Sequence, residues 1–198
     1  MQSKSVLFHC NADLMTGFGH LMRCLAIAQE ADRRDWSVIV AGRLNQRAQE
    51  LVTRTMPRAS VKVLSSISAA PQVSCLVEEL RPAVLHLDSY DEELGSFEAQ
   101  SIVVSNAQDG LFGRRPATLA IDANLGAEKR WSDTRSRALL LLGANAVQVR
   151  DEIRELRHEI RDLQGSPIRV LIVLGGTDPS SFTPRVVASI SPSAPPID

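Results

Sequence analysis

The stretch Ser5–Ala31, SVLFHCNADLMTGFGHLMRCLAIAQEA, decides the fold. It opens with a short apolar run, passes through a glycine turn and continues with apolar residues at helical spacing. We therefore predict a strand over Ser5–Asn11 and a helix over Gly19–Arg34. A strand that enters a helix through a glycine turn is the opening unit of a parallel sheet covered by helices.

The same alternation of short apolar runs and helical segments continues along the chain. Two further helices are predicted at 43–55 and 71–80, the second with Pro71 in its first position. Further strands are predicted at Ser37–Gly42, Ser60–Ser65, Ala83–Ser89, Ser101–Ala107, Ala117–Asn124 and Arg137–Gly143. The expected fold class is α/β, with a doubly wound, mainly parallel, Rossmann-like sheet.

The carboxyl-terminal quarter has a different character. Residues 151–166 are highly charged and predict a helical connector after an amino-terminal lobe at 1–150. Residues 167–198 begin again with IRVLIVLGGTDPSSF, which reads as the first strand, glycine turn and helix start of a second lobe. The chain ends soon afterwards, so we expect this second, nucleotide-binding lobe to be incomplete and the chain to be a fragment or a truncated relative.

Composition excludes several function classes. With 198 residues and a net charge of −1, nothing calls for a nucleic acid partner. Apolar runs are far shorter than the ~20 residues of a membrane helix, and the start lacks signal-peptide features. The three cysteines form no CxxC pair and no zinc-type spacing with histidine, which fits reduced thiols. We expect a cytoplasmic protein without a membrane span, a metal or a cofactor.

The run GFGH at 17–20 raises the question of ligand binding. It fails as a dinucleotide fingerprint because Met22 stands where a third glycine is required, and no P-loop lysine motif occurs in the chain. What remains is a glycine turn at a helix amino terminus, whose free amides favour negative charge. Gly17, Phe18 and Gly19 are therefore candidate substrate-binding residues.

Chemistry-bearing side chains accompany this turn. His20 can accept a proton near neutral pH and is a candidate catalytic base, although many histidines at helix starts only cap or pack. Arg23 lies one turn further on nearly the same face and could bind a phosphate or orient a partner. At the carboxyl end of a later strand, Asp88 could orient a histidine or a sugar hydroxyl, or only cap the next helix, and Tyr90 could donate to a sugar.

The second glycine turn, at residues 175–177, is a third candidate binding site. Gly175, Gly176 and Thr177 offer backbone and hydroxyl donors at a predicted helix start, where a phosphate group would bind. By itself this short pattern is weak.

Taken together, four segments resemble the UDP-sugar hydrolases of the pseudaminic acid pathway and the related spore-coat polysaccharide proteins. They are TGFGHLMRCLAIA, VLHLDSYD, LLLGANAVQVRDEI and VLIVLGGTDPSS, within about Val6–Phe182. The resemblance implies the amino-terminal lobe of a two-lobed GT-B enzyme, similar to glycosyltransferases of the cell-wall lipid-intermediate type. It implies His20 as general base, Tyr90 assisting catalysis in the sugar pocket, and Asn11 as a substrate-binding residue in the first loop, where the family usually has the aspartate of an Arg-x-Asp segment.

The function implied by the resemblance is hydrolysis of a nucleotide sugar of the UDP-2,4-diacetamido-2,4,6-trideoxyhexose type, with water attacking the anomeric carbon and UDP leaving. One alternative is a GT-B glycosyltransferase in polysaccharide or glycoconjugate biosynthesis, in which His20 activates an acceptor hydroxyl instead of water. A second alternative is a non-catalytic half-domain that binds a partner chain supplying the missing lobe. We expect the chain alone to be inactive.

Overall fold

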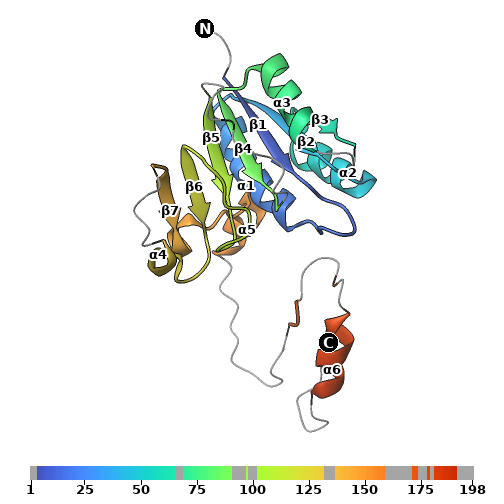
Figure 1. Ribbon diagram of the computed structural model, residues 1–198. Coiled ribbons are helices and arrows are strands. Elements are labelled where there is room, and N and C mark those ends of the chain that lie inside the picture. Colours follow the sequence, from blue (N-terminus) through green and yellow to red (C-terminus); the bar gives the residue numbers. More distant parts are fainter. Residues whose placement is uncertain are drawn as a thin grey trace.

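The computed structural model describes residues 4–65, 69–90, 97, 102–131, 137–158, 171–173, 178 and 181–190. Within these residues one sheet of seven parallel strands forms the body of the molecule (Figure 1). The strands are β1 (Ser5–Cys10), β2 (Ser37–Gly42), β3 (Ser60–Val63), β4 (Val84–Asp88), β5 (Val103–Ala107), β6 (Leu119–Asp122) and β7 (Leu139–Leu142). Their order, β3-β2-β1-β4-β5-β6-β7, confirms the predicted doubly wound fold.

Helices cover both faces of this sheet. The described residues form the helices α1 (Gly19–Arg33), α2 (Gln46–Thr55), α3 (Ala69–Leu80), α4 (Ala127–Arg130), α5 (Asp151–Leu156) and α6 (Phe182–Ser189), with a 3-10 turn η3 (Gly143–Ala146). Helices α1 and α2 cover one face and α3 the other, whereas α6 lies away from the sheet (Figure 1). Alternate residues of β1 point to opposite faces, so Phe8 packs in a core with α1 and α2 while Leu7 packs in a second core with α3. Each core is built from the apolar stripe of an amphipathic helix against the sheet.

Most predicted boundaries lie within a few residues of the observed ones. Pro71 is an exception, because α3 begins at Ala69 and the proline therefore occupies the third helical position instead of the first. Proline is still tolerated there, since the amides of the first helical turn have no partner within the helix.

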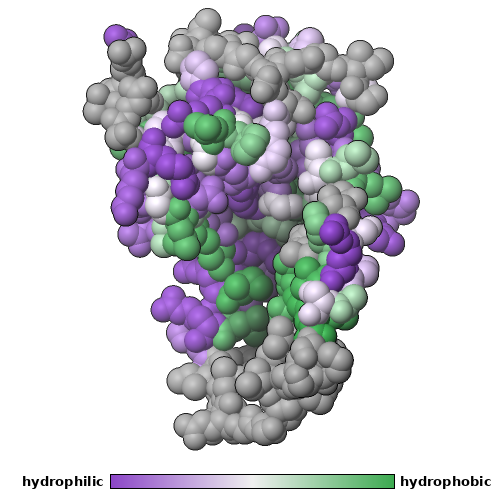
Figure 2. Space-filling view, turned by 60° about the horizontal axis from the view of Figure 1, so that its bottom comes forward, coloured by the Kyte–Doolittle hydropathy of each residue, from purple (hydrophilic) through white to green (hydrophobic). Residues whose placement is uncertain are grey.

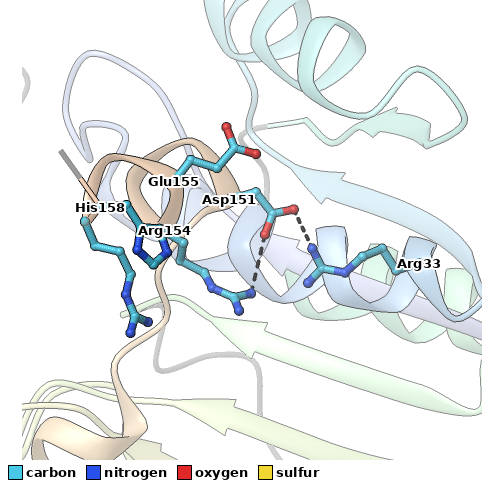
Figure 3. Close-up of a pocket in the computed structure, with 6 residues that line it drawn as sticks. Arg33, Asp151, Arg154, Glu155 and His158 are labelled. Carbon is cyan, nitrogen blue, oxygen red and sulfur yellow. Dashed lines mark hydrogen bonds and ion pairs between the residues drawn. The ribbon is translucent and has the colours of Figure 1, made fainter.

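The charged segment after the sheet begins with α5. Arg33 of α1 pairs with Asp151 at 2.6 Å, and Asp151 also meets Arg154 at 3.5 Å (Figure 3). Glu155 and His158 line the same shallow surface pocket. These polar contacts attach the start of α5 to the end of α1, so this part of the predicted connector is held to the sheet domain.

Little of the predicted second lobe lies within the described residues. Of the strand predicted over Ile168–Leu174, the structure describes residues 171–173, which form no strand and leave the Leu171 side chain 87% exposed. Helix α6 follows the second glycine turn, where the sequence predicts a helix start. The division at 150 and 166 stays a prediction. No helix in the described part of the chain is both long and apolar enough to cross a bilayer.

Candidate active site

Polar side chains from three elements meet at the carboxyl edge of the sheet. His20 and Arg23 come from the start of α1, Asp88 is the last residue of β4, and Asp109 follows the end of β5. The strand order reverses between β1 and β4, so this cluster lies at the topological switch point, where open parallel sheets bind ligands. Figure 2 turns this edge toward the reader and shows a hydrophilic centre with hydrophobic groups around it.

His20 and Asp88 form a buried dyad. The His20 Nδ1 atom lies 2.6 Å from Asp88 Oδ1, and the two side chains are 8% and 1% exposed. Because the ionised Asp88 carboxylate can only accept, we assign the proton of the neutral ring to Nδ1, an atom that Arg23 Nη2 also approaches to 3.0 Å. In the neutral ring the lone pair is therefore on Nε2, so Nε2 is the atom that can accept a proton from a substrate.

Arg23 joins two carboxylates. Its Nε and Nη2 atoms donate to Asp88 at 2.8 and 2.7 Å, and its Nη1 donates to Asp109 at 2.7 Å. Burial works to raise the pKa of Asp88, but hydrogen bonds from His20 and Arg23 outweigh it and hold that pKa below its usual value. Of the two roles predicted for Arg23, binding a phosphate or orienting a partner, these contacts favour the second, because Arg23 holds the carboxylate that orients His20.

Tyr90 covers the dyad. Its ring meets the His20 ring edge-on, with centroids 4.5 Å apart and an interplanar angle of 82°. The hydroxyl donates to Asp109 Oδ2. Burial and the Asp109 carboxylate raise the pKa of Tyr90 to about 12, so the phenol keeps its proton. Because the hydroxyl donates to Asp109 in this geometry, its oxygen can still accept from a sugar, and the predicted donation to a sugar stays a prediction.

The two glycines of the turn, Gly17 and Gly19, differ in backbone conformation. Gly17 has φ of +69°, which disfavours any residue with a Cβ atom. Gly19 has ordinary backbone geometry, and a Cβ there would meet nothing within 4 Å. Phe18 is half-buried on the core and caps α1 without a side-chain hydrogen bond. The structure therefore leaves open space beside the uncapped start of α1, as the predicted ligand approach requires.

Of the remaining predicted binding residues, the structure describes Asn11. Asn11 is buried, its Oδ1 accepting from the Arg43 amide at 2.9 Å and its Nδ2 meeting Ser89 Oγ at 3.5 Å. Its side chain thus ties strand ends together, and its predicted contact with a substrate stays a prediction. Gly175, Gly176 and Thr177 lie outside the described residues.

Sequence reasoning missed Asp109. It holds both Arg23 and Tyr90, and Asn124 Nδ2 approaches it at 3.5 Å. A signal for it was present, because Asp109 stands two residues after a predicted strand, on the same sheet edge as Asp88.

A second residue that sequence reasoning missed is His86, which lies on β4 two residues before Asp88. It is 2% exposed, and its Nδ1 meets Ser105 Oγ at 2.9 Å. Burial lowers the pKa of His86 to about 4, so the ring is neutral at physiological pH.

Comparisons with known proteins bear on the fold. No protein-family model matches the chain, and no curated protein does. Among solved structures, MurG of Acinetobacter baumannii is similar, with a TM-score of 0.50 and 13% identity over 84% of this chain and 48% of that chain. The chain thus spans about half the length of the structure it matches.

This likeness confirms the predicted GT-B-like fold with a Rossmann-like parallel sheet, and its assignment to the amino-terminal lobe stays a prediction. At 13% identity the likeness is one of fold alone. None of the matches supports the more specific resemblance to UDP-sugar hydrolases.

Proposed function

We propose that this chain supplies the amino-terminal half of the active site of a GT-B glycosyltransferase-like enzyme that acts on a nucleotide sugar. His20 is the general base of the proposal, and Asp88 is the residue that positions it. The observation that carries the proposal is the 2.6 Å contact between these side chains at the switch point of a parallel sheet.

The chemistry follows from the tautomer. An acceptor hydroxyl gives its proton to His20 Nε2 while its oxygen attacks the anomeric carbon, and the bond from that carbon to the nucleoside diphosphate breaks. Asp88 stabilises the imidazolium that forms, because its ionised carboxylate accepts a hydrogen bond from Nδ1–H. Arg23 keeps Asp88 in place and ionised. The uncapped amides at the start of α1 favour the negative charge of the departing diphosphate.

Two reactions are compatible with His20 as general base, and they differ in the molecule that gives its proton to Nε2. Water there gives hydrolysis, which the sequence resemblance favours, whereas an acceptor hydroxyl gives glycosyl transfer. MurG is a GT-B glycosyltransferase, so the likeness in fold supports transfer better than hydrolysis. We therefore place transfer first.

Exposed apolar side chains around the cluster support the idea of half a site. They lie on the loops that follow β1, β5 and β6, and they are Leu14, Met15, Leu111, Phe112 and Leu125. Each is at least 70% exposed. A monomeric surface rarely gathers such groups beside a polar cluster without a partner. A second lobe, or a partner chain in its place, is the occupant that a GT-B enzyme requires.

The activity test uses a form of the protein that carries both lobes. We expect UDP release from UDP-sugars to depend on an added acceptor, and His20→Ala to lower the rate ~10²- to 10⁴-fold. His158→Ala is the matched control, because His158 is exposed on the turn after α5. An unchanged rate in His20→Ala refutes the base, and acceptor-independent release of UDP with free sugar would replace transfer by hydrolysis.

The dyad itself can be tested on the 198-residue chain. Nitrogen-detected NMR should find the neutral His20 ring protonated on Nδ1, and Asp88→Asn should reduce that preference. A ring protonated on Nε2 in the unmodified chain would contradict the proposed base.

A further inference from the structure

Four metal-ligating side chains converge beneath α1. Cys10 ends β1 directly opposite Asp88 of β4, and His86 lies two residues before Asp88, which places it on the same face of the sheet. Cys24 reaches this face from α1. All four residues are between 0 and 2% exposed, so their side chains are shielded from solvent.

The distances suit a single ion. Ligand atoms of Cys24, His86 and Asp88 all lie within 4.8 Å of one another. Cys10 stands opposite Asp88 in the register of β1 with β4, on the face of the sheet that α1 covers. Around tetrahedral Zn²⁺, bonds of about 2.0–2.3 Å place neighbouring ligand atoms roughly 3.3–3.8 Å apart. A contraction on the order of one ångström would therefore bring the donor atoms of Cys24, His86 and Asp88 onto one cation.

His86 gives an independent reason to expect a ligand here. Its Nε2 atom is buried and has no hydrogen-bond partner among the described residues. Its other nitrogen, Nδ1, meets the hydroxyl of Ser105. A metal-bound imidazole has this arrangement, with one nitrogen on the metal and the other held by a hydrogen bond.

We propose that Cys24, His86 and Asp88, with Cys10 as the fourth donor, form a buried site for a thiophilic divalent cation such as Zn²⁺. Thiolate and imidazole donors select such ions over Mg²⁺ and Ca²⁺. Asp88 Oδ2 accepts one hydrogen bond within the described residues, from Arg23 Nε, and so keeps a lone pair for the ion. On binding, each thiol forms a sulfur–metal bond and releases its proton to water, and no oxidant or reductant is needed.

The proposal does not depend on the function proposed above, although the two share Asp88. Binding is therefore measured without any catalytic readout. The reduced 198-residue chain is titrated with Co²⁺ and with Cd²⁺ while ultraviolet and visible absorbance is recorded. We expect one equivalent to bind, with thiolate-to-metal charge-transfer bands and, for Co²⁺, the visible bands of a tetrahedral ion.

Variants identify the ligands. Cys24→Ser should abolish the charge-transfer bands or weaken binding at least tenfold, and His86→Gln should weaken it by a similar factor. Cys75→Ser is the matched control, because Cys75 is an exposed thiol outside the cluster, and it should bind as the unmodified chain does. Absence of the bands in the unmodified chain, or their loss in Cys75→Ser, overturns the proposal.

X-ray absorption of the Zn²⁺-loaded, unmodified chain covers the case in which Cys24→Ser fails to fold. Sulfur together with nitrogen or oxygen in the coordination shell supports the site. A shell of nitrogen and oxygen alone overturns it.

Discussion

Replacing Asp88 by asparagine removes the charge on which the candidate site is built. The Asp88 carboxylate accepts hydrogen bonds from His20 and from two nitrogens of Arg23, all between 2.6 and 2.8 Å. Asparagine keeps one acceptor oxygen but turns an NH₂ group toward these donors. Breaking a buried ion pair costs about 3–5 kcal/mol, and we expect about 3 kcal/mol here because Arg23 keeps Asp109 as a partner.

Thermal and urea unfolding of the 198-residue chain measure this loss. At about 2–4 °C per kcal/mol for a chain of this size, Asp88→Asn should lower the melting temperature by about 6–12 °C. The pH dependence has a definite sign. Since the pKa of Asp88 is lowered on folding, its contribution is present above the unfolded value of ~3.9 and is lost as pH falls through the folded value. The difference in free energy of unfolding between the unmodified chain and Asp88→Asn should therefore become smaller at acidic pH.

A matched control is Asp32→Asn, which breaks a surface pair. Asp32 meets Arg58 at 2.8 Å, with side chains 31% and 66% exposed. Such pairs contribute about 0–1 kcal/mol. If Asp88→Asn costs no more free energy of unfolding than Asp32→Asn at neutral pH, then the buried carboxylate is not paired as described, and the argument for an oriented His20 fails with it.

Three further predictions concern the same region. Tyr90 is the single tyrosine of the chain, so the ultraviolet absorbance of phenolate reports its ionisation directly. The midpoint of this titration should lie near pH 12, and Asp109→Asn should move it toward ~10. A midpoint near pH 10 in the unmodified chain would refute the contact between Tyr90 and Asp109. Gly17→Ala should cost about 1–2 kcal/mol because of its positive φ, whereas Gly19→Ala should leave the free energy of unfolding unchanged or slightly raised; equal losses in urea unfolding would contradict the two roles. His20→Ala should lower the free energy of unfolding by about 1.5–3 kcal/mol through its lost bond to a carboxylate, and an unchanged value would argue against the dyad.

The sequence by itself determined the alternation of strands and helices. Apolar runs of strand length and the helical spacing in α1 depend on residues close together in the chain, so periodicity reveals them. The sequence also placed His20, Asp88 and Tyr90 near one another, because the carboxyl ends of parallel strands share one edge of a sheet.

The tertiary structure decided which side chains pair with which. Arg23 lies 65 residues from Asp88 and 86 from Asp109, so no local pattern shows that it binds two carboxylates and not a phosphate. For the same reason the spacing of cysteines and histidines predicted no metal site. Cys10 and Asp88 face each other only through the register of β1 with β4, and Cys24 joins them only when α1 packs on that face. Periodicity fixes the face on which a side chain lies, but long-range packing chooses its partner across the sheet.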